Sequence, residues 1–386
     1  MSQPTAPTDP APISTPSPLG PGQRAVLREY GETPLDAVDK HLELVEQPAP
    51  DPASLGPRDV IVEVRSAAVG WVDLLMSSGQ YQHMAPPPYT PGLEYAGVLA
   101  WVGPEVEGLA VGDRVIGDGL VTGPRSHGPY QRWGGFARWA VAPAKGVIPL
   151  PAPLDFDQGA NLLGNYETAY HCLIHRGRLS AGETVLILGA TGSTGLAAVE
   201  LAKRVGATVI AAGRSPAKLA ELAELGADHT VVTTDPDAES GVRRFRDEVK
   251  ALTGGRGVEV VYDPVGGETS LEALRCVDFG ARFLIVGWAS TPFVAKGKGQ
   301  RGAPNANVLP TNLIMMKGLD VLGCPAVIST VRDPSLRPTR LRALLAWAEA
   351  GELHPKVAAQ FPLSQLHEAL RAKWASRHVG GIVVHP

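Results

Sequence analysis

The sequence predicts an α/β protein that combines a doubly wound parallel sheet with a second, β-rich domain. From about Asp155 onward, helix-length segments alternate with short, buried apolar runs. A parallel sheet produces this alternation because each strand needs a crossover connection to reach the next. Between about Gln23 and Leu150, by contrast, short β-branched runs are separated by glycine and proline turns, which is typical of a small all-β domain.

Length and composition bound the class of protein. The 386 residues are enough for two domains, and 44% of them are hydrophobic, which provides apolar surface for two cores. The formal net charge is -4 and the lysines and arginines are scattered, so the chain shows no basic patch for nucleic acid or for an anionic membrane. We therefore expect a small-molecule partner, no nucleic acid and no membrane.

The first 22 residues are rich in proline, serine and threonine. Such a segment buries too little apolar surface to offset the entropy of ordering, so residues 1–22 are predicted to be a disordered tail. The segment has neither a basic start nor an apolar core, and no apolar run in the chain approaches the roughly 20 residues of a membrane-spanning helix. We therefore expect no signal peptide and a cytoplasmic location.

The individual elements follow from local runs. In the first domain, residues 23–154, strands are expected within 59–70, 95–103 and 113–117. In the second, residues 155–325, six buried runs are expected to form the parallel strands: 184–189, 208–213, 229–234, 258–263, 282–287 and 319–323. The last part, residues 326–386, carries two amphipathic helices and a final strand, at 341–353, 363–374 and 380–386.

The segment GATGSTG, residues 189–195, lies between the first of these parallel strands and a helical pattern. Gly189, Gly192 and Gly195 permit a tight turn, let backbone N–H groups approach a pyrophosphate, and let strand and helix pack closely. We therefore predict that these glycines, with Ser193 and Thr194, bind a dinucleotide cofactor. The alternative is an ordinary turn between a strand and a helix.

The end of the strand at 208–213 decides which dinucleotide is expected. A carboxylate at this place bonds the ribose 2′-OH of NAD and repels the 2′-phosphate of NADP. The sequence has Gly213, Arg214 and Ser215 there, followed by Lys218, and no acid. Arginine, lysine and serine donate hydrogen bonds to phosphate, so these residues predict NADPH. The alternative is a solvated basic turn at the start of a helix.

Eight motifs follow one another along the chain: GWVDLLMSSGQYQ, PYTPGLEYAGVLAWVG, GLAVGDRV, GGFARWAVAPA, NYETAYHCL, GETVLILGATGSTGLAAVELAK, VVYDPVGGE and NLIMMKG. Together they resemble the zinc-independent quinone oxidoreductases of the medium-chain dehydrogenase/reductase superfamily, relatives of zeta-crystallin. The resemblance implies a GroES-like catalytic domain made from both chain ends, a Rossmann domain between them, and an active-site cleft where the two meet. It also implies a homodimer that pairs the edge strand LDVLGCP of each Rossmann sheet.

No metal site is expected. The resemblance implies that Gly70 and Leu93 stand where metal-dependent relatives carry a cysteine and a histidine ligand, and that Glu94 is a structural hydrogen-bond partner. Without those ligands there is no Lewis acid to polarise an alcohol or carbonyl oxygen. A rival pair, His171 and His175, stands four residues apart on a predicted helix, but it lacks a glutamate base and a third ligand.

The three cysteines, Cys172, Cys276 and Cys324, lie far apart in the sequence and form no CxxC spacing. This spacing argues against a disulfide framework and against a four-cysteine zinc site. We expect the cysteines to be buried small residues.

The expected reaction is the metal-free reduction by NADPH of quinones or of activated carbon–carbon double bonds in α,β-unsaturated carbonyls. Conjugation makes such acceptors electrophilic, so the protein need only orient them, stabilise charge on the distant oxygen and supply a proton. The resemblance implies Tyr81 as the acid, because a phenol donates a hydrogen bond while it stays neutral at pH 7. The alternative is that Tyr81 walls the pocket and that water is the acid. The resemblance further implies that Thr168, Val265 and Gly287 lie beside the cofactor.

The chain departs from the family pattern at two positions. Many relatives carry an asparagine where Gly70 stands, and a tyrosine near Thr233 that covers the adenine. The loss of both predicts a changed substrate choice or weaker cofactor binding, with Arg214 stacking on the adenine instead.

Two insertions, residues 121–135 and 290–310, are longer than the family needs and are expected near the cleft. Lys296, Lys298 and Arg301 in the second suggest a site for the phosphates of an acyl-CoA, and the alternative is a solvated basic loop. A 2-enoyl thioester reductase is therefore one alternative function. A cofactor-binding protein with little turnover is another. Candidates for an apolar acceptor pocket, each of which is alternatively a core residue, are Trp71, Tyr81, Met84, Trp133, Trp288, Phe293 and Met315.

Overall fold

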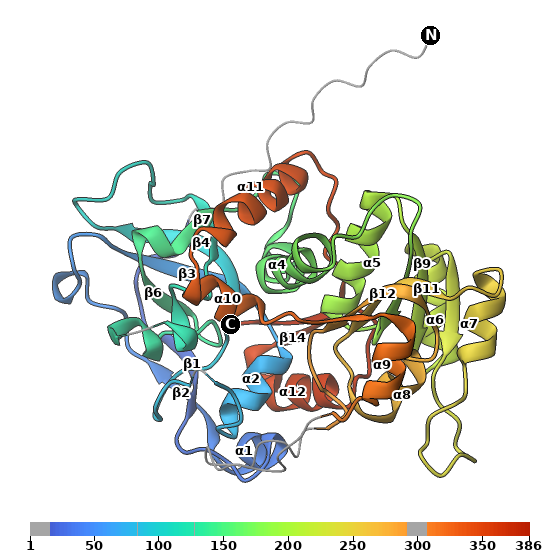
Figure 1. Ribbon diagram of the computed structural model, residues 1–386. Coiled ribbons are helices and arrows are strands. Elements are labelled where there is room, and N and C mark those ends of the chain that lie inside the picture. The colour runs from blue at the N-terminus through green and yellow to red at the C-terminus, as the bar shows by residue number, and fades with distance from the viewer. Residues whose placement is uncertain (1–15, 83, 127, 292–306) are drawn as a thin grey trace.

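The computed structural model describes residues 16–82, 84–126, 128–291 and 307–386. One sheet of six strands and one of seven organise these residues, with a two-stranded ribbon of β1 (Gly22–Leu27) and β2 (Leu42–Gln47). The seven-stranded sheet lies on the left in Figure 1 and the six-stranded sheet on the right. In the described part of the chain, no helix is long and apolar enough to cross a membrane.

The six-stranded sheet is entirely parallel, and its strands lie in the order β10-β9-β8-β11-β12-β13. Its strands are β8 (Thr184–Leu188), β9 (Thr208–Gly213), β10 (His229–Val232), β11 (Val258–Asp263), β12 (Val277–Ile285) and β13 (Asp320–Gly323). All six predicted strands are present, so the predicted doubly wound sheet is confirmed. The strand order reverses between β8 and β11, and ligands bind at the carboxyl ends of the strands at such a switch point.

Side chains of β8 alternate between two cores. Val185 and Ile187 pack in the cluster that holds the apolar face of α5, whereas Leu186 and Leu188 pack with Val249 of α7 in another cluster. Both faces of the sheet are therefore buried, which explains why the strands read as continuous apolar runs. The helices after the first domain are α3 (Phe156–Ala160), α4 (Leu163–Tyr170), α5 (Ser193–Val205), α6 (Pro216–Glu224), α7 (Arg246–Leu252), α8 (Gly267–Ala273), α9 (Thr311–Lys317), α10 (Ala326–Arg332), α11 (Leu336–Glu349) and α12 (Leu366–Trp374).

The seven-stranded sheet contains strands from both ends of the chain. Its order is β14-β15-β3-β4-β5-β7, and β6 pairs with β3. The C-terminal β15 pairs antiparallel with β3, where Val383 lies opposite Ala68. Two helices, α1 (Pro34–Lys40) and α2 (Trp71–Ser77), belong to this part of the chain. The strands are β3 (Asp59–Ala68), β4 (Glu94–Val102), β5 (Arg114–Gly117), β6 (Trp139–Pro143), β7 (Val147–Pro149), β14 (Val357–Pro362) and β15 (Gly381–His385).

The predicted disordered tail, 1–22, extends too far toward β1. The indole Nε1 of the buried Trp139 donates a hydrogen bond to the Gly20 carbonyl, at 2.7 Å, and the N–H group of Ser17 donates to Glu63, at 2.9 Å. A buried indole needs such an acceptor, and composition alone does not reveal this demand. Residues 1–15 of the tail lie outside the described residues.

All three cysteines, Cys172, Cys276 and Cys324, are buried and free of disulfides, as predicted. Cys172 and Cys324 lie close together, because the Cys172 thiol is 3.8 Å from the Cys324 carbonyl oxygen. The burial of each thiol explains its place among the apolar core residues.

Candidate cofactor-binding and active site

The glycine-rich turn between β8 and α5 brings the backbone close to where a ligand would lie. Gly189 has a φ of +60°, a conformation that favours glycine. A Cβ on Gly195 would lie 2.4 Å from the carbonyl oxygen of Gly189, so no side chain fits there. Gly192 precedes α5, and no side chain caps this helix. The N–H groups at the start of α5 are therefore available to a phosphate group, which fits a dinucleotide.

Two helices distant in sequence contact this turn. Thr194 donates a hydrogen bond to the side-chain oxygen of Asn165 on α4, at 2.9 Å. Lys373, on α12, donates a hydrogen bond to the hydroxyl oxygen of Ser193, at 3.0 Å. An ammonium group therefore lies beside the two residues that the sequence predicts to contact the pyrophosphate. Sequence reasoning missed Lys373.

Lys373 lies among acidic groups. Burial lowers the pKa of Lys373 to about 8, and the nearby carboxylates of Glu94 and Asp73 oppose this shift. Burial also raises the pKa of Glu94 to about 7 and that of Asp73 to about 6. Glu94 accepts a hydrogen bond from the Gly164 N–H group, which agrees with its predicted structural role. A charged lysine that is partly removed from water costs stability, and a bound pyrophosphate would offset that cost.

Asp73, on α2, ties together the loop at Gly70 and the loop at Gly92 and Leu93. Its carboxylate accepts hydrogen bonds from the N–H groups of Gly70 at 2.9 Å, Gly92 at 3.2 Å and Leu93 at 3.1 Å. A Cβ on Gly70 would lie 2.8 Å from Oδ2 of Asp73. A side chain at position 70 would therefore displace Asp73, which explains the glycine in physical terms. Sequence reasoning also missed Asp73.

The residues predicted to hold the 2′-phosphate lie at the carboxyl end of β9. Arg214 is exposed, and burial together with its positive charge lowers the pKa of Lys218. The Lys218 ammonium donates a hydrogen bond to the Ser376 carbonyl, in the loop before β15. Ser215 caps α6 by accepting a hydrogen bond from the Lys218 N–H group, at 3.5 Å. Gly213, at the end of β9, accepts a backbone hydrogen bond. Arg214 and Lys218 therefore place two positive charges at the end of β9, where the adenosine part of the cofactor is expected.

The loops after β11 and β12 meet the glycine-rich turn. Asp263, at the end of β11, accepts a hydrogen bond from the N–H group of Val265, at 2.9 Å. The Gly287 N–H group donates to the Asp263 carbonyl oxygen, at 3.2 Å. A Cβ on Gly189 would lie 3.2 Å from Cγ2 of Val265. The structure therefore brings Val265 and Gly287 together at the switch point beside the turn.

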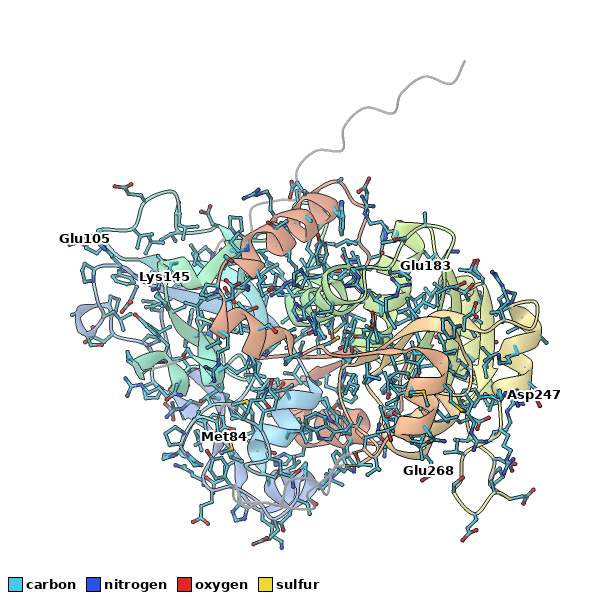
Figure 2. The ribbon with its side chains drawn as sticks, viewed as in Figure 1. Met84, Glu105, Lys145, Glu183, Asp247 and Glu268 are labelled. Carbon is cyan, nitrogen blue, oxygen red and sulfur yellow. The ribbon has the colours of Figure 1, made fainter. Side chains whose placement is uncertain are left out.

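The predicted acceptor residues are only partly gathered. Tyr81 is half-buried, in the turn after α2. Trp71 stacks on Trp374 at 5.0 Å between ring centroids, so one face of its ring is covered by the residue that follows Lys373. Met84 is half-buried, and in the view of Figure 2 its label stands next to the ribbon of α2. Trp288 is 48% exposed.

Other candidates lie elsewhere. Trp133 packs against the cluster of Ile61, Trp139 and Val141, so its assignment to the acceptor pocket is wrong. Met315, on α9, is 73% exposed. Thr233 is buried beside Gly213, to which its N–H group donates a hydrogen bond at 2.9 Å. The candidates that lie outside the described residues are Phe293, Lys296, Lys298 and Arg301, which belong to the insertion at 290–310.

The histidine pair lies on a π-helical turn, His171–Arg176. The rings of His171 and His175 stack with centroids 5.3 Å apart. Burial, with the positive charge of Arg340, lowers the pKa of His171 to about 4. Within the described ranges, no group of three or more histidine, cysteine, aspartate or glutamate residues is placed to hold a metal ion.

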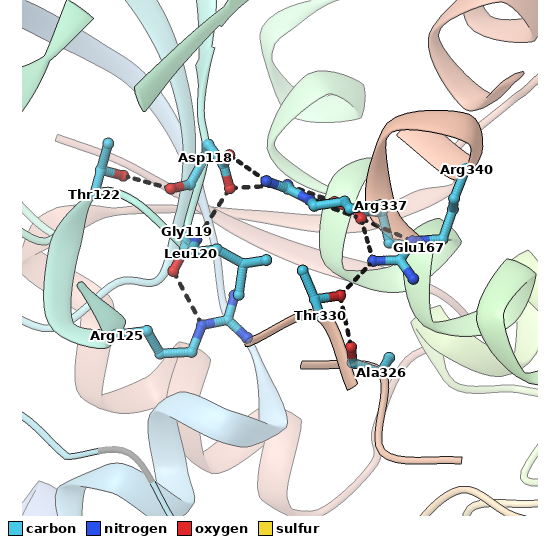
Figure 3. A network of polar contacts seen from close by, with 10 residues as sticks. All are labelled: Asp118, Gly119, Leu120, Thr122, Arg125, Glu167, Ala326, Thr330, Arg337 and Arg340. Carbon is cyan, nitrogen blue, oxygen red and sulfur yellow. Dashed lines mark hydrogen bonds and ion pairs between the residues drawn. The ribbon is translucent and has the colours of Figure 1, made fainter. Parts of the chain in front are cut away.

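A buried ion-pair network fixes α4, the helix that carries Thr168 and Asn165 (Figure 3). Arg337, on α11, contacts the Asp118 carboxylate at 2.6 and 2.9 Å and Glu167 of α4 at 2.7 Å. Arg340 also binds Glu167. Thr168 follows Glu167 directly and stands three residues after Asn165, so the network fixes the helix that carries both residues, and Asn165 contacts Thr194 of the glycine-rich turn.

Comparisons with known proteins agree with this architecture. Two family descriptions match the chain, "Alcohol dehydrogenase GroES-like domain" over residues 56–152 and "Zinc-binding dehydrogenase" over residues 193–335. The quinone oxidoreductase-like protein 2 homolog of Nematostella vectensis is 32% identical over 334 residues, which cover 86% of this chain and 83% of the relative.

Solved structures give the same result. A probable oxidoreductase from Mycobacterium abscessus superposes with a TM-score of 0.75 at 27% identity, covering 95% of this chain and 100% of the other. A mycobacterial protein complexed with NADPH superposes with a TM-score of 0.73 at 25% identity, with the same coverage.

The doubly wound sheet, the GroES-like domain and the glycine-rich turn define an oxidoreductase of the medium-chain dehydrogenase/reductase superfamily that binds a nicotinamide cofactor. Within that superfamily, the chain belongs to the quinone oxidoreductase-like family. The predicted resemblance is confirmed.

Proposed function

We propose that this protein is an NADPH-dependent reductase that transfers hydride to quinones or to activated carbon–carbon double bonds of α,β-unsaturated carbonyls. The observation that carries the proposal is the uncapped start of α5 beside the Lys373 ammonium. The name of the Nematostella relative supports the acceptor class, and the NADPH of the mycobacterial structure supports the cofactor.

The nicotinamide cofactor supplies the hydride when it is bound. The N–H groups at the start of α5 and the Lys373 ammonium bind its pyrophosphate, because both present positive charge to the same place. Arg214, Ser215 and Lys218 bind the 2′-phosphate at the end of β9. No acid stands among these residues to repel that phosphate.

The nicotinamide end lies at the switch point, where Thr168, Val265 and Gly287 face it in this proposal. The acceptor lies between this end and Tyr81, whose hydroxyl group donates a hydrogen bond to the acceptor oxygen and then its proton as negative charge develops there. Trp71, Met84 and Trp288 contribute apolar surface. Asp73 holds the loops at positions 70 and 93 that form the floor of the site.

The direct test measures NADPH consumption without oxygen against one ortho-quinone, one alkenone and one enoyl-CoA, with the products identified by mass. We expect the quinone to become a hydroquinone, or the alkenone to return saturated at its carbon–carbon bond. Turnover of the enoyl-CoA alone would favour a thioester reductase instead. If NADPH raises the melting temperature by mass action but no acceptor is consumed, the protein is a cofactor-binding protein.

Replacing Arg214 with alanine is expected to raise the dissociation constant for NADPH about 10- to 100-fold and to leave that for NADH within about threefold. The reason is that a charge-assisted hydrogen bond to a phosphate is worth about 1.5–3 kcal/mol. Isothermal titration of both cofactors measures the effect. Arg256→Ala is the control, because Arg256 is exposed on the loop before β11. Wild-type constants for NADPH and NADH within a few-fold of each other would contradict the cofactor assignment.

Replacing Tyr81 with phenylalanine is expected to lower kcat for the alkenone about 100-fold, because general acid catalysis contributes on the order of 10²–10⁴. The dissociation constant for NADPH should not change. Tyr170→Phe serves as the matched control, since Tyr170 packs against Trp347. Full turnover by the Tyr81 variant would assign the proton to water.

The family resemblance also leads us to propose a homodimer that pairs β13, the edge strand of the six-stranded sheet. Three large apolar side chains near this edge are exposed, namely Phe279, Met315 and Met316. Exposed apolar groups beside an unpaired strand edge are typical of an interface. A cytoplasmic location stays a prediction from the sequence.

A further inference from the structure

A hollow of about 540 Å³ lies on the β1–β2 ribbon. Its wall includes Arg24 and Arg28 from the segment of β1, and Arg132 and Trp133 from the insertion at 121–135. None of the residues predicted to hold the cofactor lines this hollow. We call it the arginine hollow, after Arg24, Arg28 and Arg132. Its volume is in the range of small-molecule sites.

The charge on Arg24 has no compensating partner. Burial, followed by the positive charges of Arg28 and Arg132, lowers the pKa of Arg24. Its Nε atom is buried without a hydrogen-bond partner, and no carboxylate in the described part of the chain forms an ion pair with it. Like charges at close range and an unpaired buried donor both cost free energy. A bound anion would offset both costs.

The other charged groups of the wall are weakly engaged or used elsewhere. Arg28 pairs with Glu43 at 2.9 Å, but the two side chains are 48% and 53% exposed, so water and salt screen the pair. The guanidinium of Arg132 lies over the Trp133 ring, 5.6 Å from its centroid. The carboxylate of Asp51 accepts a hydrogen bond from a backbone N–H group of its own turn, at 3.0 Å. The net field in the hollow is therefore positive.

The chemistry of the wall indicates the class of ligand. Guanidinium groups donate paired, charge-assisted hydrogen bonds that match phosphate oxygens. Pro48, Pro50 and Leu55 add apolar wall, and Trp133 offers a ring. A smaller hollow of about 290 Å³ shares Arg132 in its lining, so a ligand longer than a phosphate ion has room.

We propose that Arg24, Arg28 and Arg132 bind a phosphorylated small molecule with an apolar or aromatic part, at a site separate from the cofactor cleft. The insertion at 121–135 thereby gains a role, because it supplies Arg132 and Trp133 to this site. The proposal does not depend on the acceptor that the enzyme reduces.

Isothermal titration of the full-length protein with phenyl phosphate tests the proposal. We expect binding by the wild type, with a dissociation constant that rises at least about tenfold in Arg24→Met and in Arg132→Met. Arg24→Met should melt no lower than the wild type in the absence of ligand, since it removes a half-buried charge that has no ion-pair partner. If Arg24→Met does not fold, Arg132→Met alone decides, because that side chain is exposed.

Two controls separate this site from others. The free N–H groups at the start of α5 also suit a phosphate group, so Lys373→Met is titrated in parallel, and the binding that is lost in Arg24→Met and Arg132→Met should persist in it. Arg58→Met removes an exposed arginine that is paired with Glu105, and it too should bind as the wild type does. Unchanged binding by both arginine-hollow variants, or a loss confined to Lys373→Met, would overturn the proposal, as would the absence of binding by the wild type.

Discussion

Replacing Arg337 with leucine is expected to lower the free energy of unfolding by about 3–5 kcal/mol, the range observed when one partner of a buried ion pair is removed. Arg337 joins Asp118, at the end of β5, to Glu167 of α4. Both carboxylates are buried, and the leucine would leave them without this partner. Urea denaturation at pH 7 of the wild type and the variant measures the difference.

The pH dependence of that difference gives a second readout. Burial raises the pKa of Glu167, but the hydrogen bonds and charges of Arg337 and Arg340 outweigh burial and hold the pKa below its usual value. A carboxylate whose pKa is lowered on folding contributes stability above its unfolded pKa, and this stability is lost as the pH falls through the folded pKa. The difference in the free energy of unfolding between the wild type and Arg337→Leu should therefore shrink below about pH 4.

The control is Arg58→Leu, which removes one partner of an exposed pair with Glu105. Exposed pairs contribute at most about 1 kcal/mol, so this variant should remain close to the wild type. A similar small loss for Arg337→Leu would show that the network in Figure 3 does not hold α4 in place.

Replacing Lys373 with methionine is expected to weaken NADPH binding about 10- to 100-fold while the unliganded protein loses no stability. The ammonium group contacts Ser193 at the glycine-rich turn and would make a charge-assisted hydrogen bond to the pyrophosphate. Methionine keeps the apolar stem of the side chain and removes the charge that burial disfavours. Titration with NADPH and a thermal melt without it measure the two effects.

The sign of the pH effect follows from the lowered pKa. Folded Lys373 titrates at about 8, whereas an unfolded lysine titrates at about 10.4. Between these values the unfolded chain binds more protons, so the stability of the wild type rises with pH across this window. The stability of Lys373→Met should lack the contribution of this lysine to that rise with pH.

Lys203→Met is the matched control, because Lys203 stands near the other end of α5 and pairs with Asp228. The dissociation constant of Lys203→Met for NADPH should equal that of the wild type. Equal constants for Lys373→Met and the wild type would contradict a role of Lys373 at the pyrophosphate.

The doubly wound sheet and the glycine-rich turn were predictable because their signals are local. The apolar runs of β8 and β9 and the glycines at 189, 192 and 195 stand within one short stretch, and each glycine has a steric reason that neighbouring residues reveal. The residues predicted around the turn, such as Val265 and Gly287, lie at ends of parallel strands, where the topology gathers them.

Lys373 and Asp73 were not predictable in this way. Lys373 stands 180 residues from Ser193, and on its own helix it reads as an ordinary surface lysine of an amphipathic pattern. Asp73 reads as a polar residue in the first turn of α2, because its bonds to Gly92 and Leu93 exist only after the chain has folded. Trp133 illustrates the other case, since this aromatic residue of a predicted insertion packs beside Ile61, Trp139 and Val141, as its alternative assignment to a core predicts.

The pairing of β15 with β3 has a consequence for the order of folding. The parallel sheet is complete once β8 to β13 have left the ribosome, because all its strands lie between residues 184 and 323. The other sheet begins first in the sequence, and β3 pairs with β4 and β6, but the end of β3 at Ala67 and Ala68 gains its partner only when Val383 and Val384 have been synthesised. Contacts of such large sequence separation close late, so the cofactor-binding half forms on a chain in which the end of β3 at Ala67 and Ala68 still lacks its β15 partner.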